Sequence, residues 1–263
     1  MKKTLFLIAF FWCLLASAQN GTLNISKINS VAFQADAFLG YDKFGFWYYV
    51  TNNVLIKQNE LVSVEYKNLS LGKISKVDLQ NPLKIVVFYE TFNTVILLDN
   101  QLNETQKISF SEHTIPIVAA AVGISSQNRL WIYNTLSQQI GLYDFQTNDY
   151  KPITTPFTGT VKAYVSDFNY FQWIDEQLNR RATDVYGKIS DLGKTEPFDQ
   201  FRIGNEYWYF YSKDNTIFAK DLKNNLIYTV PVAEKTFKSF VSKDQILTIF
   251  TTDGITNYKI ILP

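Results

Sequence analysis

The chain has 263 residues, of which 46% are hydrophobic and 19% are charged. This balance is typical of a globular protein and excludes a disordered tail or a coiled coil. The formal net charge is only +1, and the sequence contains one Cys and one His. These counts exclude a disulfide framework, a Cys/His zinc site and a basic surface for nucleic acid.

The start of the chain has the pattern of a secretory signal peptide. Lys2 and Lys3 supply positive charge, an apolar run covers positions 5–15, and a small-residue cleavage site follows at 16–18. The apolar run is shorter than the roughly 20 residues that span a bilayer. We therefore expect residues 1–18 to be removed. The remaining chain, with no transmembrane segment, is then exported and either periplasmic or outer-membrane-associated.

After this segment, short aromatic and β-branched runs separated by polar turns indicate a succession of strands. The most apolar runs begin at positions 46, 85, 130, 171, 207 and 246. Their starts are separated by 39, 45, 41, 36 and 39 residues. Six copies at a period of about 40 residues indicate a repeat architecture.

Two residue types recur with this period. A Trp lies in four of the apolar runs, and an Asp lies near the end of the strand that follows four of them. We expect the Trp side chains to fill the gaps between neighbouring repeats and the Asp side chains to mark the repeat turns. The residues are Trp47, Trp131, Trp173 and Trp208, and Asp99, Asp144, Asp184 and Asp221. In the first copy, Gln58 or Asn59 stands near the place of the Asp.

Strands that are apolar on both faces must be covered on both faces, and blades stacked around an axis meet that demand. We therefore predict an all-β fold, a six-bladed β-propeller that forms a single domain over residues 19–263. A sandwich or a barrel does not predict the period. The last copy supplies three strands, so we expect the stretch 22–33 to pair at the outer edge of the last blade and close the ring.

Short motifs resemble known propeller repeats. The sequence Tyr-Val-Thr-Asn-Asn-Val at 49–54 resembles the repeat of YVTN-type propellers, and Leu-Trp-Ile-Tyr at 130–133 is similar to regulator-type propeller repeats. The stretches 77–85 and 97–99 resemble exported propeller-like proteins of Bacteroidota, whose role is largely unassigned. The resemblance implies a propeller fold, and it implies envelope and secretion complexes as one setting.

The sequence offers little catalytic chemistry. His113 is the only imidazole, and it lies on a predicted loop without an evident partner. Arg202 is predicted in an inner strand, whereas Arg129, Arg180 and Arg181 flank outer hairpins, so no arginine triad is expected. Calcium, which takes oxygen ligands, is the one metal left open. Its candidate ligands, at the ends of inner strands, are Asp36, Asp167, Asp199 and Asp244.

The sequence therefore favours a non-enzymatic interaction module, or an accessory subunit of a periplasmic or outer-membrane complex in protein secretion or surface assembly. Its partner is expected to be a protein of the cell envelope. One alternative is a ligand-binding or hydrolytic propeller with an axial calcium site. Another is a surface carbohydrate binder, which requires several exposed Trp or Tyr faces. The candidate partner contacts are Phe44, Phe46, Tyr150, Phe157, Tyr170 and Arg202.

Overall fold

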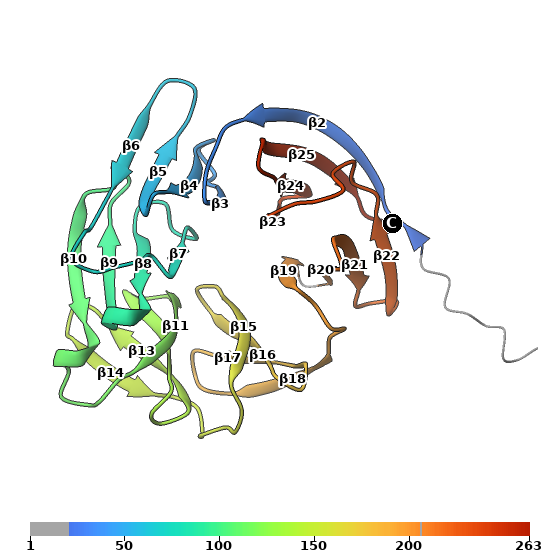
Figure 1. Cartoon of the computed structure of the whole chain (residues 1–263). Helices are drawn as coiled ribbons and strands as arrows, with labels where there is room; N and C mark the ends of the chain where they lie inside the picture. Colours follow the sequence, from blue (N-terminus) through green and yellow to red (C-terminus); the bar gives the residue numbers. More distant parts are fainter. Residues whose placement is uncertain (1–20, 206) are drawn as a thin grey trace, which may run out of the picture.

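The computed structural model describes residues 21–205 and 207–263, so the predicted signal peptide lies outside the described residues. Six sheets surround a central axis, and each belongs to one blade (Figure 1). The predicted six-bladed propeller is confirmed. In the described part of the chain, no helix is long and apolar enough to cross a membrane.

Each of the first five blades is an antiparallel meander whose first strand lies next to the axis (Figure 1). Blade 1 comprises β3 (Ala37–Tyr41), β4 (Trp47–Thr51), β5 (Val54–Gln58) and β6 (Ser63–Tyr66). Blade 2 comprises β7 (Lys76–Asp78), β8 (Ile85–Tyr89), β9 (Thr94–Leu98) and β10 (Glu104–Ser109), with short 3-10 helices η1 (Glu90–Phe92) and η2 (Phe110–Glu112). Blade 3 comprises β11 (Ala119–Ile124), β12 (Arg129–Asn134), β13 (Gln139–Asp144) and β14 (Asp149–Pro152).

The other half of the ring repeats this plan. Blade 4 comprises β15 (Val161–Ser166), β16 (Tyr170–Asp175), β17 (Asn179–Asp184) and β18 (Ile189–Lys194). Blade 5 comprises β19 (Gln200–Asn205), β20 (Trp208–Lys213), β21 (Thr216–Asp221) and β22 (Leu226–Val230). Blade 6 comprises β23 (Ser239–Lys243), β24 (Ile246–Phe250) and β25 (Gly254–Ile261), and its fourth strand comes from the N-terminal part of the chain.

That fourth strand is β2 (Asn24–Ala32), which pairs antiparallel with β25 from Asn24 opposite Ile261 to Ala32 opposite Gly254. The predicted closure of the last blade by residues 22–33 is confirmed. A shorter strand, β1 (Gly21–Thr22), also pairs in parallel with β22 of blade 5. The N-terminal part of the described chain therefore joins blades 5 and 6 as well as completing blade 6.

Neighbouring blades pack through apolar clusters. All five residues of β8 and all five of β9 are buried, because these strands are covered on both faces by blades 1 and 3. Such a cluster is present at five of the six junctions between blades in the described chain. The junction between blades 4 and 5 differs, and there the guanidinium carbon of Arg180 lies 4.7 Å from the ring centre of Tyr209.

The four recurring Trp side chains pack in these clusters. Trp131 and Trp173 lie in the cluster between blades 3 and 4, Trp208 lies between blades 5 and 6, and Trp47 packs against the cluster between blades 6 and 1. All four lie on second strands, but their register differs. Their partners on the third strands are Gln58 for Trp47, Asp221 for Trp208, Leu142 for Trp131 and Arg181 for Trp173.

The recurring Asp residues shape the turns between third and fourth strands. In each turn, one carboxylate oxygen accepts hydrogen bonds from backbone N–H groups two to four residues farther along. This is the side-chain turn for which Asp and Asn are favoured. In blade 1, Asn59 makes the same contacts with the N–H groups of Leu61 and Val62. The Asp residues are Asp99, Asp144, Asp184 and Asp221.

Candidate functional site

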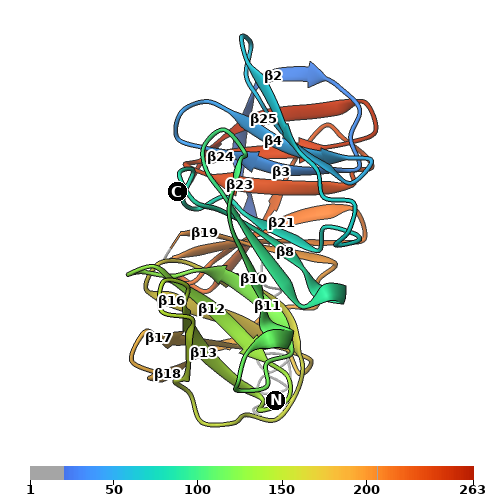
Figure 2. The same ribbon diagram turned by 90° about the vertical axis from the view of Figure 1, so that its left-hand side faces the viewer.

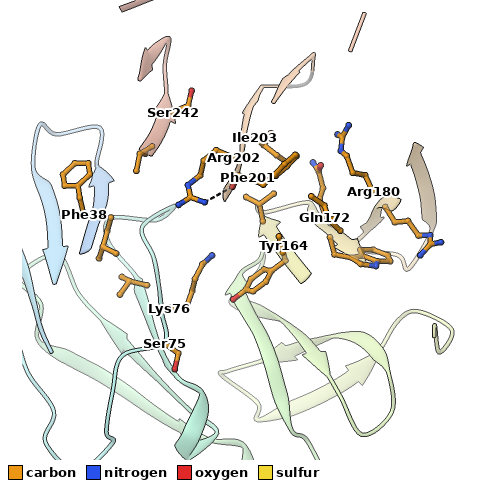
Figure 3. A pocket seen from close by; sticks show the side chains of 18 residues that line it. Phe38, Ser75, Lys76, Tyr164, Gln172, Arg180, Phe201, Arg202, Ile203 and Ser242 are labelled. Atoms are coloured by element: carbon orange, nitrogen blue, oxygen red, sulfur yellow. Dashed lines mark hydrogen bonds between the residues drawn. The ribbon is translucent and has the colours of Figure 1, made fainter. Parts of the chain in front are cut away.

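A cavity of about 380 Å³ lies among the inner strands (Figure 3). Five inner strands contribute to its wall, namely β3, β7, β15, β19 and β23, and blade 4 also contributes residues of β16 and β17. The cavity thus extends from the axis into the junction between blades 4 and 5, where the apolar packing of the other junctions is replaced by polar side chains. A cavity of this size falls within the usual range for small-ligand sites.

Blade 3 does not contribute to the wall, because its inner strand β11 is covered by side chains of its neighbours. The hydroxyl of Tyr164 lies 3.2 Å from both the backbone N and the backbone O of Val122. The carboxylate of Asp78 accepts a 2.8 Å hydrogen bond from the N–H of Ile124. Gly123 makes this approach feasible, since a Cβ at this position would collide with the hydroxyl of Ser166.

Two cationic side chains extend toward one another in the cavity, Lys76 from β7 and Arg202 from β19 (Figure 3). The Lys76 ammonium lies 4.6 Å from the ring centre of Tyr164, which is a cation–π contact. Arg202 donates hydrogen bonds from Nε to the Phe240 carbonyl at 3.1 Å and from Nη1 to the Phe201 carbonyl at 2.7 Å. Neither cation has a carboxylate oxygen within 4.0 Å among the described residues.

The electrostatics of the cavity disfavour charge on these groups. Desolvation lowers the pKa of Lys76, and the positive charge of Arg202 lowers it further. Desolvation also lowers the pKa of Arg202. The carboxylate of Asp78 opposes the effect on Lys76 but is itself desolvated, which raises its pKa, and it accepts backbone hydrogen bonds from Ile124 and Gln80. The charges that Lys76 and Arg202 carry in the cavity are therefore incompletely compensated.

Two further arginines, which the sequence predicts beside outer hairpins, also line this cavity. Arg180 and Arg181 lie on β17, the third strand of blade 4, and both contribute to the wall. Arg181 forms an ion pair with Asp175 at 2.9 Å. Desolvation lowers the pKa of Arg180, which lies over the ring of Tyr209. The open junction between blades 4 and 5 admits these third-strand residues to the cavity.

The four candidate calcium ligands do not converge. Asp36 and Asp199 precede the inner strands β3 and β19, and their carboxylates accept N–H groups of Asn52 at 2.7 Å and of Asp214 at 3.0 Å. Asp167 and Asp244 follow the inner strands β15 and β23 and therefore lie at the opposite end of the axis. Within the described residues, no three His, Cys, Asp or Glu side chains are grouped as metal ligands.

Some candidate partner contacts are accessible and one is not. Phe44 and Tyr170 have exposed fractions of 56% and 49%, and Phe46 is half-buried under the ammonium of Lys57. Tyr150 is only 2% exposed, because it packs in the cluster between blades 2 and 3. Its side chain is not available to a partner, which corrects the prediction for this residue.

Of the remaining candidates, one packs among aromatic rings and one lines the cavity. Phe157 stacks between Tyr133 and Trp173, with ring centres 5.4 and 5.0 Å away. Arg202 lies in the axial cavity described above. His113 lies beside Tyr143, its Nδ1 3.1 Å from the backbone N–H of Ile115 and its Nε2 3.0 Å from the Asn148 carbonyl.

One face of the disc carries many exposed apolar side chains. The loops that join first to second strands and third to fourth strands open on this face, which we call the loop face; Figure 2 views the molecule from the side. Leu61 and Tyr186 are the most exposed, at 91% and 89%. The exposed large apolar residues in or beside these loops are Phe44, Leu61, Val62, Leu83, Phe168, Tyr170, Tyr186, Tyr207, Leu226 and Ile246.

Comparisons with known proteins support the fold and go no further. No protein-family model matches the chain, and no curated protein matches it. Virginiamycin B lyase from Staphylococcus aureus is similar in structure, with a TM-score of 0.55, 12% identity, and coverage of 85% of this chain and 80% of that one. The Cps50 (Swd1) β-propeller domain of Myceliophteria thermophila gives a TM-score of 0.60 at 9% identity, with 90% and 100% covered.

A third similar structure is the extracellular domain of a protein from B. thetaiotaomicron described as a one-component system. Its TM-score is 0.54 at 9% identity, with 90% of this chain and 40% of that chain covered. Identities this low show a shared fold alone. The chain is thus a six-bladed β-propeller that resembles virginiamycin B lyase and the extracellular propeller from B. thetaiotaomicron.

Proposed function

We propose that the protein is a non-catalytic binding module that holds a protein partner in the cell envelope. The observation that carries this proposal is the set of exposed apolar side chains on the loop face. Large exposed apolar residues on one side of a rigid scaffold are typical of protein-binding surfaces. Phe44 and Tyr170, two of the contacts expected from the sequence, belong to this set.

The setting of this module is proposed from the sequence. The signal-peptide pattern supports export to the periplasm or outer membrane, and the repeats resemble exported propellers of Bacteroidota. Together they support an accessory role in a complex for protein secretion or surface assembly. The scaffold suits this role because each blade is fixed by its neighbours, so loops from different blades keep a constant spacing.

The experiment compares partner capture by two matched variants. C-terminally tagged protein is purified from solubilised envelopes of its own host, and co-eluting proteins are identified by mass spectrometry. Leu61→Ser together with Tyr186→Ser changes the loop face, whereas Leu69→Ser together with Leu136→Ser changes exposed residues of the opposite face. We expect a stoichiometric partner that the first variant loses and the second retains. Equal capture by both variants, or no stoichiometric partner, would contradict the proposal.

The two alternatives make different demands on the structure. A calcium site would have to form in a cavity where Lys76 and Arg202 repel cations. A carbohydrate surface would have to be built on exposed tyrosines such as Tyr170 and Tyr186, because Trp131 and Trp173 are buried. Both alternatives predict a rise in melting temperature, with millimolar Ca²⁺ in one case and with an oligosaccharide in the other.

A further inference from the structure

We propose that the axial cavity binds a small organic anion, with a carboxylate or phosphate group held between Lys76 and Arg202 and an apolar body against the cavity wall. This site is separate from the loop face, and it does not depend on the proposed protein partner.

The charge arrangement is the first argument. Lys76 and Arg202 come from blades 2 and 5, and the charge of Arg202 disfavours the charged form of Lys76, yet no carboxylate of the described chain lies within 4.0 Å of either. Keeping two like charges at close range is unfavourable, and a bound anion removes that cost. Arg181, another cation of the cavity wall, already has Asp175 as its partner.

The hydrogen-bonding capacity is the second argument. A guanidinium has five N–H groups, and the structure gives Arg202 two acceptors, both backbone carbonyls that hold it in place. The ammonium of Lys76 contacts an aromatic ring rather than an oxygen. Lys76 and Arg202 thus keep N–H donors without an acceptor among the described residues, which suits an oxyanion.

The walls and the volume define the rest of the ligand. Phe38, Phe201 and Ile203 line the cavity beside the charged pair. A space of about 380 Å³ is larger than an inorganic anion requires and lies at the small end of the range for organic ligands. An aromatic or branched aliphatic group fits this wall, so the class is a small organic carboxylate or phosphate monoester.

The test measures binding of defined probes by isothermal titration calorimetry at low and at high salt. The probes are benzoate and phenyl phosphate, with benzamide as the neutral analogue and inorganic phosphate as the anion without an apolar body. We expect benzoate or phenyl phosphate to bind at least tenfold more tightly than benzamide and inorganic phosphate, and more weakly at high salt. Absence of binding by both organic anions at 10 mM, or equal affinity for benzamide, would overturn the proposal.

Variants locate the site. Lys76→Gln and Arg202→Gln are each expected to weaken probe binding tenfold or more. Lys162→Gln is the matched control, since Lys162 lies on the inner strand β15 over the ring of Phe198 but does not line the cavity. Lys76→Gln removes a like-charge contact, so its unliganded melting temperature should equal or exceed that of the wild type while the probe-induced rise is lost. Retained affinity in the folded Lys76→Gln protein would overturn the site.

Discussion

At the scale of single residues, the turn aspartates act through local hydrogen bonds, as Asp221 shows. Asp221 is 3% exposed and accepts the backbone N–H groups of Lys223 and Asn224 and the Asn224 side-chain amide, the last at 2.7 Å. Desolvation alone would raise its pKa, but these hydrogen bonds and nearby Lys223 together lower it below 3.8. The folded protein therefore favours the ionised form.

Asp221→Ala is expected to lower the free energy of unfolding by about 1.5–3 kcal/mol at pH 7, because it removes the charged acceptor of two backbone N–H groups and of the Asn224 amide. Asp221→Asn keeps an acceptor and should cost less. Urea unfolding monitored by Trp fluorescence measures both. Because the folded pKa is depressed, the advantage of the wild type over Asp221→Asn is complete above pH 3.8 and is lost as the pH falls through the folded pKa. A difference between these two proteins that stays constant from pH 7 to pH 2 would contradict this assignment.

Gly123 shows how one residue without a side chain lets side chains of the neighbouring blades cover the inner strand β11. Gly123→Ala places a methyl group against the hydroxyl of Ser166, and we expect a loss of about 1–3 kcal/mol of stability from overpacking. Ser166→Ala removes that hydroxyl and should restore part of the loss in the double variant. Thermal unfolding of the wild type, the two single variants and the double variant measures the coupling between the two positions. If the two single effects on stability simply add in the double variant, the two side chains do not collide.

The composition of the cavity could not be predicted from single residues. Apolar strands and Asp turns have local sequence patterns, so the sequence predicts the repeat and its turn residues. Lys76, in contrast, looks like an ordinary exposed lysine, and Arg180 and Arg181 lie on a third strand. Lys76 reaches the cavity from an inner strand, whereas the two arginines reach it only because the junction between blades 4 and 5 lacks an apolar cluster. The prediction that Tyr150 is accessible to a partner is wrong, because a buried aromatic residue outside the repeat looks the same in the sequence as an exposed one.

At the scale of the strand, closure of the ring depends on a polar contact as well as on strand pairing. The Asn257 amide on β25 donates to the Asn29 side-chain oxygen on β2 at 2.8 Å and lies 3.0 Å from the Tyr41 hydroxyl on β3. Its oxygen accepts the Thr248 hydroxyl of β24 at 2.7 Å. One side chain thus connects three strands of blade 6 with the inner strand of blade 1.

Asn257→Leu is expected to lower the free energy of unfolding by about 1–3 kcal/mol, because it leaves the hydroxyl of Thr248, which is only 2% exposed, without its acceptor. Ser30→Ala is the matched control. It removes one hydroxyl contact, that with Thr256, from the same pair of strands. Chemical denaturation, fitted with the same m-value for both variants, compares their free energies of unfolding. Equal losses of stability in the two variants would show that the Asn257 contacts contribute nothing particular to closure.

Strand order was more predictable than strand register. A missing fourth strand in the last copy and a spare strand-like stretch near the start together imply closure by that stretch, and β2 takes this place. The four Trp residues all lie on the second strand of their blades but at different positions along it. A Trp side chain is large enough to fill the gap between blades from more than one of these positions. The additional pairing of Gly21–Thr22 with β22 had no sequence signal, since two residues carry no periodicity.

At the scale of the whole molecule, the ring is held by the pairing of β2 with β25 and of β1 with β22. Leu23, between these two strands, is 2% exposed and packs in the cluster that joins blades 5 and 6. Removal of residues 21–33 would expose the edges of both blades and open this cluster. Blades 5 and 6 therefore depend on a segment that is remote from both of them in the sequence.

A deletion and a permutation test this dependence together. A protein that begins at residue 34 should melt at least about 10 °C lower than one that begins at residue 21, because it loses several kcal/mol of strand pairing and apolar burial. In the permuted protein, residues 34–263 are followed by a short Gly/Ser linker and then by residues 21–33. The linker is feasible because Asn24 lies opposite Ile261, so the two ends to be joined are adjacent.

We expect the permuted protein to recover most of the lost stability and the β-sheet circular dichroism of the parent, since the same contacts form from the other end of the chain. A remaining deficit is expected because blade 6 is then no longer linked to blade 1 through the chain and depends on side-chain contacts such as that of Asn257 with Tyr41. If the permuted protein were as unstable as the deletion, the stability would depend on the covalent link between β2 and β3 and not on the pairing of β2 with β25.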